Sequence, residues 1–167
     1  MKQESDSDSD SSLDEFEKRL ADLGVGVTAV PRSDLSDAVD DATEGTAVAS
    51  SDLDGSLLPD YIETQPSDDE IRDADTGITR AEFGVASYGT LGITSEARSS
   101  QVSLYPDRHV AVLRRDDLVE DIETALELVD SADTDVVLAT GVSSTSDMGE
   151  SVRGVHGVST AEVVVVE

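Results

Sequence analysis

Apolar residues recur along the chain at two spacings, one typical of helices and one typical of strands. Helical spacing is clearest over residues 116–129 and again near the start of the chain. The stripe near the start consists of Leu13, Phe16, Leu20 and Leu23. Ser12 and Glu15 stand at capping-box spacing before this stripe and Gly24 follows it, so we expect a helix between Ser12 and Gly24.

Short runs rich in Val, Ile, Ala and Thr lie between these patterns and predict strands. They cover residues 25–30, 46–49, 83–87, 91–94, 109–113, 135–139 and 161–166. The runs on either side of Gly89 predict two paired strands or one sharply bent strand. Short helices are expected after Ser33 and over residues 68–74. Strands alternating with helices indicate an α/β fold with a single domain, in which a mostly parallel mixed sheet is flanked by helices.

The first residues differ in composition from the rest of the chain. Residues 1–11 are polar, acidic and rich in Ser, and we expect this tail to be disordered. Residues 12–167 are enough for one domain with its own hydrophobic core.

Charge narrows the possible surroundings and partners. Eleven basic residues against 38 acidic ones give a formal net charge of −27. The acids are scattered, as on the surface of a halophile's cytoplasmic protein; an acidic tail that binds a basic partner would concentrate them, as only residues 4–10 do. The basic footprint that nucleic-acid binding needs is absent, so we expect no nucleic-acid partner.

Several classes of chemistry find no support in the sequence. The chain has no Cys, which excludes disulfides, a thiol nucleophile and thiolate-held iron–sulfur clusters. Two His are too few for a His-rich metal site, and no P-loop, complete dinucleotide fingerprint, zincin helix or nucleophile elbow is present. We therefore assign no cofactor, metal or catalytic residue. No secretory signal or membrane-length apolar run occurs, so we expect a cytoplasmic protein without a membrane partner.

Three loops that contain Gly stand at predicted strand ends and are the candidate ligand site. Their candidate residues are Gly89, Thr90, Gly141, Ser143, Ser144, Thr145, Asp147, Gly154, His156 and Gly157. Loops of Gly and hydroxyl residues offer free backbone N–H groups to an anion, and in open α/β sheets ligands bind at the carboxyl ends of strands. We expect these loops to share one cleft at that edge. The simpler interpretation of each loop is a turn or a helix cap, and His109 and Arg98 are interpreted as a structural and a surface residue.

Four segments in order resemble the signatures of the LUD domain family. They are GITRAEFGVA at 77–86 followed by Gly89-Thr90, SLYPDRHVAV at 103–112, GVSSTSDM at 141–148 and GVHG at 154–157. The resemblance covers about residues 77–167. Within the family, the sequence is most similar to the lactate utilization protein C group. Ser87 stands where the family commonly has Glu, Ser144 where it has Arg or Lys, and Val142 and Val158 where it has Pro.

The resemblance implies a fold of the NagB/RpiA/CoA-transferase-like type and a role in the oxidation of L-lactate to pyruvate. Iron–sulfur proteins are the implied partners and carry the redox centres, which agrees with a chain that has no Cys. Two hypotheses follow. The protein is a non-redox component of this system that binds a small carboxylate, or it is a binding protein or enzyme of the wider fold that handles a phosphate, CoA or folate-type ligand. A scaffold that has lost its site is a third possibility.

Overall fold

The computed structural model of the protein describes residues 4–131, 135–142, 144–147, 150–153 and 158–167. The helices are α1 (Glu4–Asp22), α2 (Leu35–Ala42), α3 (Asp68–Asp73), α4 (Ala97–Leu104) and α5 (Ile122–Ser131), with 3-10 turns η1 (Arg32–Asp34), η2 (Gly55–Leu57) and η3 (Arg115–Asp117). The strands are β1 (Gly26–Val30), β2 (Ala47–Ala49), β3 (Thr76–Ala81), β4 (Phe83–Val85), β5 (Thr90–Thr94), β6 (Arg108–Arg114), β7 (Leu118–Val119), β8 (Val136–Thr140), β9 (Ser144–Asp147), β10 (Glu150–Arg153) and β11 (Thr160–Val166).

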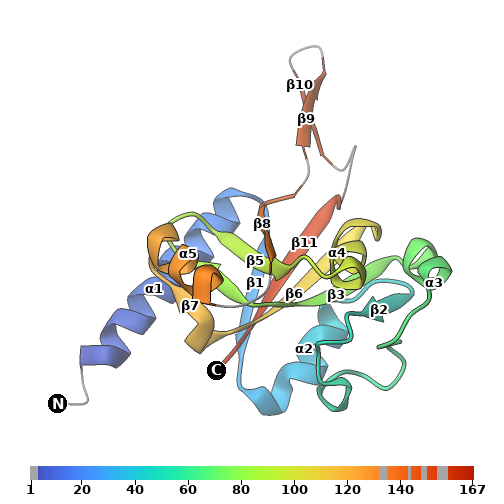
Figure 1. The fold of residues 1–167 in the computed structure, drawn as a ribbon, viewed down its shortest axis with the longest axis horizontal. Coiled ribbons are helices and arrows are strands. Elements are labelled where there is room, and N and C mark those ends of the chain that lie inside the picture. Colours follow the sequence, from blue (N-terminus) through green and yellow to red (C-terminus); the bar gives the residue numbers. More distant parts are fainter. Residues whose placement is uncertain (1–3, 132–134, 143, 148–149, 154–157) are drawn as a thin grey trace.

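A five-stranded parallel sheet forms the centre of the molecule (Figure 1). Its strand order is β1-β11-β6-β3-β2, and each pairing is parallel. Strand β11 ends in four consecutive Val residues and lies between β1 and β6, where both of its edges are hydrogen-bonded. The arrangement confirms the predicted α/β fold with a mostly parallel sheet between helices.

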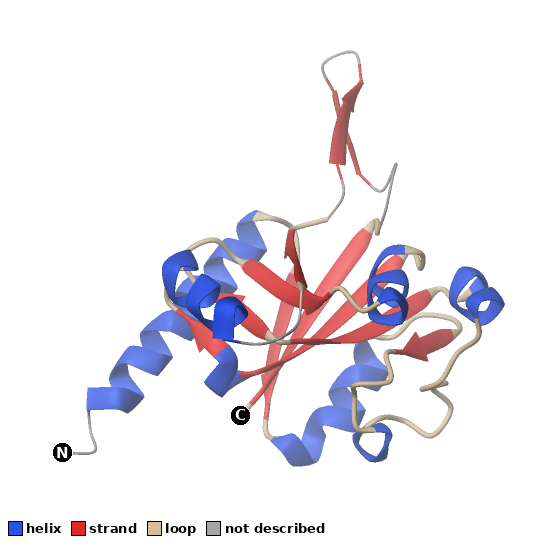
Figure 2. Cartoon of the chain, viewed as in Figure 1, coloured by secondary structure: helices blue, strands red, loops and turns tan. Residues whose placement is uncertain are grey.

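The two faces of this sheet pack against different layers because successive side chains of a strand point to opposite sides. Ile78, Val110, Val112, Val164 and Val166 face α2 and pack against its Leu35 and Val39. Ala81, Ala111, Leu113, Val163 and Val165 face the opposite side, toward α1 and a second sheet. Helices therefore cover both sides, as Figure 2 shows.

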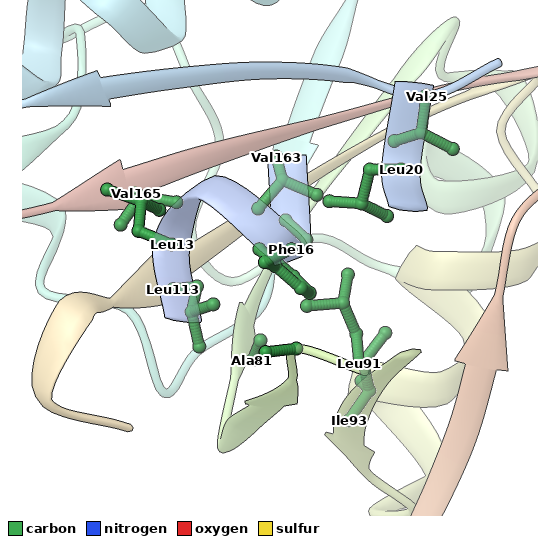
Figure 3. Packing of buried hydrophobic residues seen from close by; sticks show 12 residues of the cluster. Leu13, Phe16, Leu20, Val25, Ala81, Leu91, Ile93, Leu113, Val163 and Val165 are labelled. Carbon is green, nitrogen blue, oxygen red and sulfur yellow. The ribbon is translucent and has the colours of Figure 1, made fainter. Parts of the chain in front are cut away.

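Helix α1 supplies the largest apolar side chains to the second face. Leu13, Phe16 and Leu20, three residues of the predicted stripe, are buried there. Figure 3 shows them directed from α1 toward side chains of β6 and β11. The structure begins α1 at Glu4, eight residues before the expected Ser12, so it draws residues 4–11 as helix. The disorder expected for residues 1–11 in solution stays a prediction.

A second, four-stranded sheet lies over that face, in the order β7-β4-β5-β8. Strand β4 pairs antiparallel with β5 and parallel with β7, so the predicted pair of strands around Gly89 is confirmed. Leu91 and Ile93 of β5 pack toward the main sheet, whereas Phe83 and Val85 of β4 pack toward α5. The sequence predicted one sheet, and the division into two was not foreseen.

The helix expected over residues 116–129 begins later than predicted. Leu118 and Val119 form β7 and pair with β4, and α5 begins at Ile122. The carboxylate of Asp121 accepts a hydrogen bond of 2.8 Å from the backbone N–H of Thr124, which fixes the start of the helix. Pairing with β4 therefore prevails over the helical spacing of the preceding apolar residues.

The pattern of apolar residues missed β3 and α4, and also the short strands β7, β9 and β10. Strand β3 is central to the main sheet but has the sequence TGITRA, in which Gly and Arg interrupt the apolar pattern. Gly77 is required because α4 packs directly on β3: a Cβ atom at residue 77 would lie 1.9 Å from the carbonyl oxygen of Val102. Gly77 thus makes β3 difficult to recognise in the sequence, and its lack of a side chain allows α4 to approach the strand.

Arg108 joins three elements at the amino-terminal edge of the main sheet. Its guanidinium contacts Glu162 of β11 at 2.8 Å and Glu44 at 3.3 Å, and its Nε donates to the carbonyl oxygen of Ala42 at 2.5 Å. The side chain is only 17% exposed. Arg108 is therefore a structural cation whose donors are used within the protein.

Candidate functional site

A cavity of about 230 Å³ lies between the two sheets, beside the amino-terminal halves of β6 and β11. We call it the motif cavity because residues of three of the four motif segments line it; the fourth segment, 154–157, lies outside the described residues. Gly89, Ser103, His109 and Gly141 line it from the first three segments, and Val158, directly after the fourth, lines it as well. The remaining lining residues are mostly apolar: Leu20, Val25, Leu91, Ile93, Leu104, Ala111, Val137, Ala139, Ala161, Glu162 and Val163.

The glycines of the cavity allow loops to pack against α1. Gly89 has φ +64°, and a Cβ atom there would lie 3.0 Å from the Cβ of Arg19. Gly141 has φ +71° and lies against the side chain of Leu23. Both backbones occupy the left-handed region that favours glycine, so these residues shape the wall of the cavity.

Thr90 fixes the two loops relative to each other. Its hydroxyl lies 2.6 Å from the hydroxyl of Thr140, and the two residues are directly paired across β5 and β8. Sheet pairing therefore brings Gly89 and Thr90 close to Gly141, the first residue of the second predicted loop.

The location of these loops differs from the sequence-based expectation. They were expected at the carboxyl edge of a sheet. The cavity instead lies near the amino ends of the parallel strands β6 and β11, and the turn between the antiparallel strands β4 and β5 places Gly89 there. Gly141 follows β8, which belongs to the second sheet.

The other predicted residues are not among the described residues that line the motif cavity. Ser144, Thr145 and Asp147 belong to β9, which pairs with β10 in a hairpin that extends away from the body of the molecule (Figure 1). Ser143, Gly154, His156 and Gly157 lie outside the described residues. A cleft shared by all ten residues stays a prediction.

His109, which its place in a strand indicated to be a structural residue, is a polar residue of the cavity. It is 6% exposed, and its ring Nε2 lies 2.8 Å from the hydroxyl of Thr79. Burial lowers the pKa of His109 to about 4, so the ring is neutral at pH 7. Its position inside the second motif segment was the signal that could have identified it.

The remaining polar groups do not add positive charge. The hydroxyl of Ser103 donates to the carbonyl oxygen of Ser100 at 2.9 Å, and Glu162 is paired with Arg108. No basic side chain lines the cavity in the part of the chain that the structure describes. The motif cavity thus suits an uncharged, largely apolar group better than an anion.

Among residues 4–131 and the later described segments, no group of three His, Asp or Glu side chains could hold a metal ion. No helix in the described part of the chain is long and apolar enough to span a bilayer.

Residues 62–166 match the LUD domain family. Lactate utilization protein C of Deinococcus radiodurans is 29% identical over 168 residues, covering 92% of this chain and 79% of that protein. A crystal structure of a DUF162 family protein from Deinococcus radiodurans has the same fold, with a TM-score of 0.79 and 23% identity over 95% of this chain and 98% of that one.

Proposed function

The chain belongs to the LUD domain family, and on that premise we propose that it is a non-redox component of an L-lactate oxidation system. Oxidation of L-lactate to pyruvate releases two electrons and two protons. A chain without Cys has no thiolates to hold an iron–sulfur cluster, so the electrons pass to iron–sulfur partner proteins. The similarity to lactate utilization protein C over most of both chains supports this assignment.

One structural observation supports the proposal: residues of three motif segments, Gly89, His109 and Gly141, line the motif cavity although they are far apart in the sequence. Motifs that only formed turns would not be expected to line the same cavity. The alternative, a phosphate, CoA or folate-type ligand, is less well supported because the similarity is to a lactate utilization protein. The described lining of this cavity offers no cation to a phosphate or to a carboxylate.

Growth on L-lactate tests the proposal. Deletion of the gene in the organism that encodes it should abolish growth on L-lactate and leave growth on pyruvate unchanged. Complementation with Ser103→Leu, which places a larger apolar side chain at the cavity, should fail. Gln101→Leu is the matched control, because Gln101 lies on the same helix but does not line the cavity.

Normal growth of the deletion strain on L-lactate would refute the role in lactate oxidation. Full complementation by Ser103→Leu would refute the functional importance of the motif cavity.

A further inference from the structure

A second hollow region lies at the carboxyl edge of the main sheet, outside the motif cavity. Each of the five parallel strands ends there: Arg32 follows β1, Asp52 follows β2, Arg80 lies near the end of β3, and Arg114 and Val166 end β6 and β11. These residues, with Leu35, Leu53, Asp54, Leu57 and Val112, line a hollow of about 180 Å³. In open α/β sheets this edge is where ligands bind.

An adjoining hollow of about 460 Å³ shares Asp52 and Arg80 with the first. It adds Glu82, Thr94, Glu96 and Asp117, and an apolar wall of Phe83, Leu128, Val129 and Val136. We call the two hollows together the edge cleft. One half of the edge cleft is rich in Arg, and the other combines carboxylates with apolar side chains.

The concentration of Arg is unusual for this chain. Three of its nine arginines line the smaller hollow, although acids outnumber basic residues 38 to 11. Two carboxylates, Asp52 and Asp54, share that lining, so the guanidinium groups outnumber them. The lining of the smaller hollow therefore has one more guanidinium than carboxylate groups, whereas the larger hollow adds three carboxylates and no further cation.

These guanidinium groups are only loosely paired. The N···O distances are 3.9 Å for Arg32 and Asp54, 3.6 Å for Arg80 and Glu82, and 3.4 Å and 4.0 Å for Arg114 with Asp116 and Asp117. A strong charge-assisted hydrogen bond is about 2.7–2.9 Å long, as in the 2.8 Å contact of Arg108 with Glu162. The arginines of the edge cleft thus keep donors for a ligand.

Arg80 and Glu82 are the best-placed pair of the cleft. They lie on either side of Ala81, where the chain leaves β3 and bends at Glu82 toward β4, and their charged groups are 3.6 Å apart. Their side chains are 38% and 33% exposed, less than those of Arg32 and Arg114 at 63% and 58%. Beside them, Oδ2 of Asp117 is buried and has no hydrogen-bond partner among the described residues.

We propose that the edge cleft binds a small 2-hydroxycarboxylate, whose carboxylate accepts hydrogen bonds from Arg80 and whose hydroxyl donates to Glu82. Arg32 and Arg114 add positive charge around the carboxylate, and the apolar wall accommodates a short aliphatic group. The anion site follows from the arginines; the choice of a hydroxy acid rests on the proposed function.

Calorimetric titration of the purified full chain tests the site, at constant ionic strength and constant chloride. L-lactate should bind saturably with a millimolar dissociation constant, and propionate, which lacks only the hydroxyl, should bind about fivefold more weakly. Arg80→Gln should weaken L-lactate binding at least about tenfold. Arg72→Gln, an exposed Arg of α3 paired with Asp69 at 3.4 Å, should bind as the unmodified protein does. Arg114→Gln is a second variant, expected to weaken binding less than Arg80→Gln.

Absence of saturable L-lactate binding, or unchanged binding by Arg80→Gln, would overturn the site. Equal binding of propionate would overturn the contact with Glu82, and tighter binding of inorganic phosphate would assign the cleft to a phosphorylated ligand instead. Because the growth test does not measure binding, a protein needed for growth on L-lactate that binds no L-lactate would refute this inference alone.

Discussion

The hydroxyl of Thr79 and the ring Nε2 of His109 lie 2.8 Å apart between the adjacent strands β3 and β6. Both residues are buried. The folded protein therefore holds a neutral imidazole that water surrounds only after unfolding, and this difference makes stability depend on pH.

We predict that the free energy of unfolding falls by about 3 kcal/mol through His109 as pH decreases from 6.5 toward 4. The pKa of His109 is lowered to about 4 in the folded state, so over this range the unfolded chain binds a proton that the folded chain excludes. The contribution is present above pH 6.5 and is lost as pH falls through the folded-state pKa. Denaturant unfolding of the unmodified protein and of His109→Gln across this range measures it. Parallel pH profiles for the two proteins would contradict the prediction.

The close approach of α4 to β3 predicts that Gly77→Ala destabilises the protein by more than about 2 kcal/mol. The new Cβ atom would meet the carbonyl oxygen of Val102 at 1.9 Å, and a backbone atom cannot move away without shifting the helix. Gly26→Ala is the control, because its Cβ would meet nothing closer than the side chain of Glu162 at 3.4 Å. Thermal unfolding of both variants checks the difference, and similar midpoints would show that α4 can be displaced easily.

Net charge predicts a strong dependence of stability on salt. With a formal charge of −27, the folded state repels itself in dilute buffer, and salt screens that repulsion. The unfolding midpoint should rise steeply with KCl up to molar concentrations. An unchanged midpoint between low and molar salt would refute the prediction and, with it, the halophilic interpretation of the surface.

Ser50 predicts a stabilising substitution. The residue is fully buried at the end of β2, and its hydroxyl has no hydrogen-bond partner among the described residues, although its backbone N–H donates to Ile78 at 2.8 Å. Ser50→Ala removes the unsatisfied group and keeps the backbone contact, so the free energy of unfolding should rise by about 1 kcal/mol. Ser51→Ala, at the exposed neighbouring residue, should leave stability nearly unchanged. A loss of stability in Ser50→Ala would indicate a partner for the hydroxyl, such as a bound water.

The absence of Cys predicts the spectrum of the purified protein. The chain should carry neither iron nor sulfide in stoichiometric amounts and should lack the visible absorption of an iron–sulfur cluster. Elemental analysis and absorption spectroscopy measure this directly. Stoichiometric iron and sulfide in the pure protein would mean that ligands other than thiolates hold a cluster.

The sequence predicted those elements whose local pattern agrees with their final surroundings. The runs at 109–113 and 161–166 became β6 and β11, which lie inside the parallel sheet and are mostly buried, and the run at 25–30 became β1, an edge strand that is largely exposed. Strand β3 was missed because Gly77 and Arg80 interrupt its apolar pattern. Gly77 allows the close approach of α4 and Arg80 lies at the carboxyl edge of the sheet, and local residue preferences contain neither fact.

The candidate site was predictable only in part, for the same reason. Gly89, Thr90 and Gly141 are brought together, but the chain reversal from β4 to β5 places them near the amino end of the main sheet. Arg80 was not singled out because its strand was not recognised. Its proximity to Arg32 and Arg114 depends on the order of the strands, which local patterns do not encode.

Strand order also constrains how the protein can form during translation. β11 lies between β1 and β6, and Gly26 pairs with Glu162, so β1 has no neighbour in the main sheet until residues 160–166 leave the ribosome. Until then α1 and β6 expose the apolar side chains that later pack against β11. The nascent chain consequently remains an open intermediate until residues 160–166 are made, and we expect chaperone binding to persist until β11 is inserted.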